Sequence, residues 1–328
     1  MSRSRWCRSV GLFRAGLVLG ALALAGTVAV GQSQDFSSVQ VQALKVQGNV
    51  YMLVGAGGNV TVQAGSDGVV LVDTQFAEMS DKILAAVRQI SDQPIRYIIN
   101  THVHGDHTGG NLNLAGAGSG VAAAGPGRVG FVGATATIVA HENVLARMTS
   151  AQPPVPSQAW PGTTYYTGTK ELYLNGEAIL ITHQPNAHTD GDSTVYFRGS
   201  DVVAAGDVFV ATTYPFIDRE RGGTLQGIID AANDILDITV PRHHQEGGTY
   251  VVPGHGRLCD EHDVLEYRDM LTIVRDRVKE MTARGLTLAQ VKAARPTLDY
   301  DPRWGADSGF WTTDMFVEAV YKEFSGGK

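Results

Sequence analysis

Hydrophobic and polar residues alternate in short runs from Val39 to Asp73, and Gly and Asn separate the runs. The four runs read VQVQALKV, NVYMLVG, GNVTVQAG and DGVVLVDT. An alternation with a period of two is typical of half-buried strands, and Gly and Asn favour the tight turns between them. The pattern therefore predicts an antiparallel β-meander over this part of the chain.

The pattern changes to helical spacing in MSDKILAAVRQIS, residues 79–91, with a start signal at Ser80 or Asp81. IRYIIN (95–100) follows as a buried strand. Residues 114–133 are rich in Gly and Ala without periodicity, which predicts a loop insertion. ATIVA (136–140) resumes as a strand, HENVLARMTS (141–150) is a short helix, and residues 151–166 form a Pro-rich loop.

A second β-rich half begins near residue 170 with the runs KELYLNGEAILITHQ, STVYFRG, DVVAAGD and TYVVPG. It contains one helix in TLQGIIDAANDILDI, and it is followed by helical spacing over 261–282, 287–294 and 312–324. Two β-rich halves, each followed by helices, predict an α+β fold in which two sheets pack together with helices outside.

The first thirty-one residues have the composition of a secretory signal peptide. Four Arg and no acid precede an apolar run over residues 15–30, and the small residues Ala29 and Gly31 end it. Sixteen apolar residues are short for a membrane span, so cleavage after Gly31 is favoured over a retained anchor. We expect a periplasmic or secreted protein with no stable membrane insertion after cleavage.

Charge and cysteine content limit the class of partner. Without residues 1–31 the chain has 22 Lys and Arg against 33 Asp and Glu, a net charge of −11, which disfavours nucleic acid. Cys7 leaves with the signal, and Cys259 then has no cysteine with which to form an intrachain disulfide. The expected partner is a small-molecule substrate, and homo-oligomerisation is left open.

The stretch NTHVHGDHTGGN, residues 100–111, follows the strand at 95–100 and has the pattern H-x-H-x-D-H. Neutral imidazoles and carboxylates are ligands that zinc prefers. In an extended chain His102 and His104 point the same way, and a sharp turn at Gly105 presents Asp106 and His107 on another side. One loop can thus supply ligands to two ions, whereas a single ion would struggle to use all four.

Three further candidate ligands lie where other apolar runs begin or end. His188 precedes the run STVYF, Asp207 ends VVAAGD, and His255 follows YVVPG. The alternatives are ordinary loop histidines and a turn or helix-cap aspartate. Asp73, at the end of VVLVDT, is either a plain turn residue or a residue that orients a ligand.

The motifs H-x-H-x-D-H, A-H-T, G-D and G-H-G occur in an order that resembles the metallo-β-lactamase fold superfamily. The resemblance covers about residues 39–275 and implies an αββα sandwich of the α+β class, here with extra C-terminal helices. It implies one metal site in His102, His104 and His188, and a second in Asp106, His107 and His255. Asp207 would bridge two zinc ions per chain.

The resemblance implies a zinc-dependent hydrolase in which a metal-bridging hydroxide opens an ester, thioester, lactone or β-lactam-type carbonyl. We assign Asp106 as the catalytic position, because its loss should remove the second ion. Asp207 is typical of glyoxalase-II-like thioesterases and lactonases, where class B β-lactamases have a Cys or a non-ligand. Arg219 and Arg221 are the nearest cations for a β-lactam carboxylate.

Other readings remain. The chain is alternatively a true metallo-β-lactamase, a mononuclear iron sulfur dioxygenase, or an accessory protein of an exported redox system. His141 is predicted to be structural because it opens a helix.

The expected organisation is a signal peptide over 1–31, a hydrolase domain over 32–280 and a helical extension over 281–328. Trp160 either caps the core or covers an apolar substrate.

Overall fold

The computed structural model describes residues 35–120, 134–243 and 247–326. The predicted signal peptide, and residues 121–133 of the predicted insertion, lie outside the described residues. The described residues from Phe36 onward form one compact unit. None of the helices within the described ranges has the length and apolar character needed to cross a membrane.

The first half of the chain folds into a seven-stranded sheet in which every strand lies beside its neighbour in sequence. Its first four strands pair antiparallel, which confirms the predicted meander, and the pairings from the fourth strand onward are parallel. The strands are β1 Gln42–Gln47, β2 Val50–Val54, β3 Val60–Gly65, β4 Gly68–Val72, β5 Ile95–Ile99, β6 Thr137–His141 and β7 Thr163–Tyr165.

The second half contributes a six-stranded sheet with the order β13-β12-β11-β10-β9-β8. β11 and β12 pair parallel, and the other pairs are antiparallel. The strands are β8 Thr169–Leu174, β9 Glu177–Gln184, β10 Asp192–Phe197, β11 Val202–Gly206, β12 Tyr250–Pro253 and β13 Cys259–Asp260.

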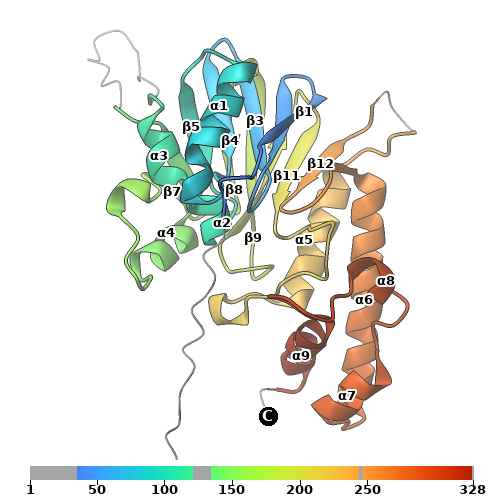
Figure 1. The fold of residues 1–328 in the computed structure, drawn as a ribbon. Coiled ribbons are helices and arrows are strands. Elements are labelled where there is room, and N and C mark those ends of the chain that lie inside the picture. The colour runs from blue at the N-terminus through green and yellow to red at the C-terminus, as the bar shows by residue number, and fades with distance from the viewer. Residues whose placement is uncertain (1–34, 121–133, 244–246, 327–328) are drawn as a thin grey trace, which may run out of the picture. The chain divides into compact units, whose positions relative to one another are not determined.

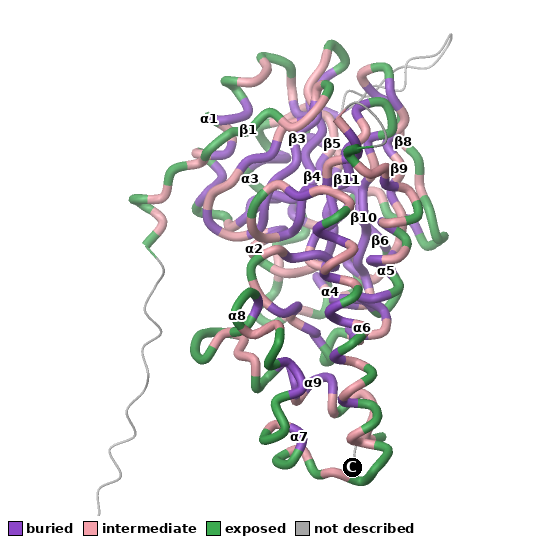
Figure 2. Tube along the Cα trace, turned by 90° about the vertical axis from the view of Figure 1, so that its right-hand side faces the viewer, coloured by how far each residue is buried: buried purple, intermediate pink, exposed green. Residues whose placement is uncertain are grey.

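Helices cover the outer face of each sheet, which confirms the αββα sandwich (Figure 1). Side chains of both sheets, among them Val70, Ile99, Ile181 and Val252, form the apolar layer between them. The strands are accordingly buried and the outer turns exposed (Figure 2). On the first sheet lie α1 Ser80–Ile90, α3 Asn111–Gly116 and α4 Glu142–Thr149; on the second lie α5 Leu225–Ile238 and α6 Glu261–Ala283.

The last three helices pack beside α6 at one end of the sandwich (Figure 1). They are α7 Leu288–Ala294, α8 Asp301–Trp304 and α9 Thr313–Phe324. Val291, Trp304 and Phe316 belong to the same buried cluster as residues of α5 and α6. The expected domain boundary at residue 280 falls inside α6, and the apolar core continues across it.

Two local predictions need correction. Leu114–Gly116 belong to α3 rather than to a loop, because Leu114 packs into the core beneath the first sheet. Thr163–Tyr165 form the edge strand β7 rather than part of a loop, since β6 supplies the hydrogen-bonding partners. Trp160 packs against the small buried cluster that contains Val144 and donates its indole N–H to Val155 O at 3.0 Å.

Candidate metal centre

The seven predicted ligands converge at one end of the two sheets, each from the loop after a strand. His102, His104, Asp106 and His107 follow β5, and His188 lies between β9 and β10. Asp207 follows β11 and His255 follows β12. The carboxyl ends of parallel strands meet at one edge of a sheet, so β11 and β12 bring their two ligands together.

The chain turns at Gly105 as predicted, but the start of a short helix makes the turn, not the backbone freedom of glycine. His104 is extended and serves as the N-cap of α2, Gly105–Thr108, so the start of a short helix turns the chain. A Cβ on Gly105 would meet no atom within 4 Å, and glycine is therefore not required there. Asp106 and His107 lie on this helix, and the His107 ring packs beside His102 with ring centroids 4.2 Å apart.

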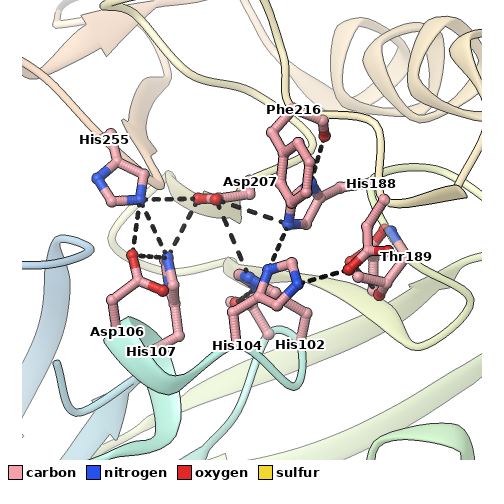
Figure 3. Close-up of polar contacts among 12 residues, drawn as sticks. His102, His104, Asp106, His107, His188, Thr189, Asp207, Phe216 and His255 are labelled. Carbon is pink, nitrogen blue, oxygen red and sulfur yellow. Dashed lines mark hydrogen bonds and ion pairs between the residues drawn. The ribbon is translucent and has the colours of Figure 1, made fainter. Parts of the chain in front are cut away.

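The first ligand group consists of His102, His104 and His188, whose candidate ligand atoms lie within 4.8 Å of one another. His104 Nδ1 and His188 Nε2 are 2.8 Å apart. His102 and His188 are fully buried and His104 is partly exposed. The three side chains face a common point (Figure 3).

The second group consists of Asp106, His107 and His255. His255 Nε2 lies 3.2 Å from Asp106 Oδ2 and 3.3 Å from His107 Nε2. Asp106 and His255 are partly exposed, so this group borders solvent.

Asp207 lies between the two groups and presents one carboxylate oxygen to each (Figure 3). Its Oδ1 is 3.2 Å from His107 Nε2 and 3.5 Å from His255 Nε2. Its Oδ2 is 3.7 Å from His188 Nε2 and 4.0 Å from His102 Nε2. This is the arrangement expected of a carboxylate shared by two ions.

Unpaired polar atoms in this cluster fit divalent cations. His102 Nε2 and Asp207 Oδ1 are buried and have no hydrogen-bond partner, an arrangement that costs free energy unless another group binds them. A Cβ on Gly254 would lie 1.9 Å from Asp207 Oδ1, and one on Gly58 would lie 2.1 Å from His107 Cε1. Both glycines are therefore needed for the ligands to sit where they do.

Four histidines bind the protein through one ring nitrogen and turn the other toward the cluster. His102 Nδ1 lies 2.9 Å from Thr101 Oγ1, and His107 Nδ1 lies 2.8 Å from Asp73 Oδ2. His188 Nδ1 donates to Phe216 O at 2.6 Å, and His104 Nε2 lies 2.8 Å from Asp218 Oδ2. Such outer contacts fix ring orientation and tautomer, and Asp73 is thus a ligand-orienting residue.

Asp218 is a site residue that the sequence analysis missed. It is buried, accepts from His104, and also accepts from Arg221 Nη1 at 2.6 Å. Burial alone would raise its pKa, but the hydrogen bonds from His104 and Arg221 lower the pKa well below the usual value. Asp218 lies in a loop without periodicity, and only the following Arg-x-Arg hinted at a paired acid.

The pKa shifts of His102, His188 and Asp207 agree with ligand chemistry, whereas for His107 and His255 burial would lower the pKa but the carboxylate of Asp207 raises it. Burial and the neighbouring histidines hold the pKa of His102 well below its usual value, and burial lowers that of His188 to about 4, so both rings are neutral. Burial would raise the pKa of Asp207, but His107 and His255 lower it well below the usual range. Neutral imidazoles and an ionised carboxylate are the forms that bind metal.

The other histidines that the structure describes lie outside the cluster. His141 is structural, because it caps α4 by accepting from Asn143 N and stacks on His183 with ring centroids 3.6 Å apart. Burial and the neighbouring His183 lower the pKa of His141 to about 4. His262 lies 3.5 Å from Glu266. Cys259 is buried, and burial raises its pKa to about 12, so the thiol is unreactive.

A cavity of about 540 Å³ opens onto the cluster. Four metal-ligand candidates border it, with Arg221 and five apolar or aromatic side chains around them. The lining residues include His104, Asp106, Asp207, His255, Phe76, Val210, Phe216, Phe310 and Trp311. A second cavity, bordered by the Pro-rich loop, shares Gly105 and Arg221 with it.

The fold has close counterparts among solved structures. A metallo-β-lactamase from Pontibacter korlensis matches 71% of this chain and 99% of its own, with 16% identity and a TM-score of 0.54. The stereoselective inverting sec-alkylsulfatase Pisa1 from Pseudomonas sp. matches 87% of this chain, with 15% identity and a TM-score of 0.59. The chain spans about half the length of that alkylsulfatase.

Sequence comparison gives the family. The model of the metallo-β-lactamase superfamily matches residues 53–293. The chain belongs to this superfamily and is a hydrolase with candidate metal-binding His and Asp groups. A linear primary-alkylsulfatase from Pseudomonas sp. (strain ATCC 19151) is 47% identical over 45 residues, which cover 13% of this chain and 8% of that protein.

Proposed function

We propose that the protein is an exported dinuclear zinc hydrolase that opens an ester, thioester, lactone or β-lactam-type carbonyl. The observation that carries the proposal is the position of Asp207, with one carboxylate oxygen toward each of two three-residue ligand groups. Imidazole and carboxylate donors suit zinc. The N-terminal pattern described above supports export.

The first ion would be held by His102, His104 and His188, and the second by Asp106, His107 and His255. Two divalent ions in such a site make water nucleophilic at neutral pH and polarise the oxygen that becomes negatively charged. The protein itself orients the ligands. Because such ions would activate water as the nucleophile, no Ser or Cys would need to attack the substrate, consistent with the raised pKa of Cys259.

Asp106 belongs to the second ligand group and to no other. It is partly exposed, and its Oδ2 lies 3.2 Å from His255 Nε2. Replacement by Ala should therefore lose the second ion while the first three histidines still bind theirs. This separation makes Asp106→Ala the variant of choice for testing the mechanism.

The test is hydrolysis of a chromogenic cephalosporin, a thioester and a lactone by zinc-loaded protein. We expect turnover of at least one substrate and a fall of at least about 100-fold in Asp106→Ala. Asp269→Ala is the matched control, because Asp269 is an exposed acid whose partner is its neighbour Arg268. Undiminished activity in Asp106→Ala would refute the two-ion mechanism.

A second candidate is hydrolysis of sulfate esters. One observation in its favour is the stretch of 47% identity with the linear primary-alkylsulfatase. Another is that the sec-alkylsulfatase structure covers 87% of this chain, whereas the Pontibacter korlensis metallo-β-lactamase covers 71%. The same ligands would hold the ions. Release of sulfate from an alkyl sulfate, measured beside the carbonyl substrates, decides between the two, since the preferred substrate has the higher kcat/KM.

A further inference from the structure

The C-terminal part of the chain reaches the cavity through one short loop. Ala306 and Thr313 close this loop, because Thr313 N donates to Ala306 O at 2.9 Å and Ala306 N donates to Thr313 Oγ1 at 3.0 Å. Residues 307–312 lie between these two contacts, and Trp311 packs against the buried cluster that contains residues of α5, α6 and α9. Phe310 and Trp311 lie in this segment, and both line the cavity.

The loop is anchored to the segment that follows Asp207. Tyr214 N donates to Trp304 O at 3.0 Å, and the Tyr214 ring stacks on Phe316 with centroids 4.6 Å apart. Tyr214 is buried, so the contact is a fixed part of the core. The metal-ligand segment and the C-terminal loop are therefore held in one arrangement.

A continuous row of aromatic rings connects this loop to the metal ligands. The Phe216 ring lies 5.8 Å from His104 and 5.7 Å from His188, measured between centroids. On its other side Phe216 packs edge-on against Phe310 at 5.1 Å and Trp311 at 4.8 Å. Such geometries are typical of packed aromatic walls.

The exposed side chain of Phe310 indicates a binding surface because it continues the row of aromatic rings that begins at the metal ligands. Its side chain is 77% exposed, and single exposed apolar residues are ordinary in soluble proteins. Phe310, however, extends the aromatic row from the ligands to the rim of the cavity. A substrate group lying along the row would cover Phe310 and bury apolar area on both partners.

We propose that Phe216, Phe310 and Trp311 bind the apolar part of the substrate, so that the C-terminal loop selects substrates with an apolar group of four or more carbons. The inference rests on the proposed function, because it assigns a substrate class to the same site. A cavity of about 540 Å³ has room for such a group beside the reacting bond. Arg221, the cation among the cavity's lining residues, is already paired with Asp218 at 2.6 Å, so the apolar wall is the feature that selects the substrate group.

The first test measures binding without turnover. Butyrate, hexanoate and octanoate are titrated into zinc-loaded protein by calorimetry; they share one carboxylate, so differences among them report the apolar contact. Each buried methylene strengthens binding by up to about fourfold, so hexanoate should bind up to about 15-fold more tightly than butyrate. We expect Phe310→Ala to reduce this ratio to about threefold and Phe310→Leu to give an intermediate ratio.

Tyr173→Ala is the matched control, because Tyr173 is an aromatic residue of similar exposure, 73%, on β8 and outside the cavity lining. Its ratio should equal that of the wild type. The inference is overturned if affinity does not rise with chain length, or if Phe310→Ala leaves the ratio unchanged.

The second test repeats the series with p-nitrophenyl esters of the same acids and compares kcat/KM. A rise with chain length that Phe310→Ala abolishes supports the inference. Turnover that is equal for all esters and both proteins overturns it while the proposed function stands. Chain-length-dependent binding with no turnover of these esters, the cephalosporin, the thioester or the lactone would instead refute the carbonyl chemistry and leave the apolar wall in place.

Discussion

Replacement of Asp218 by Asn should weaken metal binding without unfolding the protein. Asp218 holds His104 through a hydrogen bond of 2.8 Å and is itself held by Arg221 at 2.6 Å. Asn has the same size but no charge, so His104 loses a charged acceptor and Arg221 loses its partner. The other two histidines of the first group are unaffected.

The size of the effect follows from two independent rules. A hydrogen bond to a charged group contributes about 1.5–3 kcal/mol, which corresponds to about 10- to 150-fold in affinity. Loss of a residue that orients a metal-binding histidine typically weakens metal affinity by about 10- to 100-fold. Both estimates place Asp218→Asn between one and two orders of magnitude below the wild type for the first ion.

The assay is a zinc titration in competition with a chelating dye at pH 7.5. Asp299→Asn is the control, since Asp299 also pairs with an arginine, Arg277 at 2.7 Å, but is exposed and remote from the ligands. Equal zinc affinity in Asp218→Asn and wild type would refute the argument. So would an equal loss in Asp299→Asn, because the effect would then not depend on His104.

Two further variants test the close approach of Gly254 to Asp207 and the pH dependence of folding stability through His141. Gly254→Ala should abolish tight zinc binding, because the new Cβ would overlap Asp207 Oδ1. Gly116→Ala is the control and should bind zinc normally, because a Cβ at Gly116 meets no atom within 4 Å. Normal zinc content in Gly254→Ala would disprove the close approach of Gly254 to Asp207. His141 has a pKa lowered to about 4, so the unfolded chain binds its proton more readily, and stability should fall as pH drops from about 6.5 toward 4. His141→Asn keeps a capping side chain and should reduce the loss in free energy of unfolding over this pH range by about 1–3 kcal/mol, as measured by urea unfolding. An unchanged loss would mean that His141 does not cause the pH dependence.

Much of the metal centre was predictable because each ligand has a local signal. Asp207 and His255 stand next to Gly at the ends of apolar runs, and His188 precedes an apolar run, where a core residue is not expected. The alternating runs likewise predicted the meander, because the period of two is local. The structure brings all seven predicted ligands together.

The rest depends on contacts between distant segments. Asp218 orients His104 across 114 positions, and nothing near either residue in sequence announces the pair. Phe310 matters only because Ala306 and Thr313 close a loop that the fold places over Phe216. The strand at Thr163–Tyr165 was missed because its pairing partner, rather than its own pattern, makes it a strand.

The metal content of the purified protein tests the central claim most directly. Elemental analysis of wild type and Asp106→Ala, after equilibration with zinc and removal of free metal, gives the number of ions per chain. The account predicts two zinc ions in the wild type and one in Asp106→Ala. One iron and no zinc in the wild type, or two ions retained in Asp106→Ala, would contradict it.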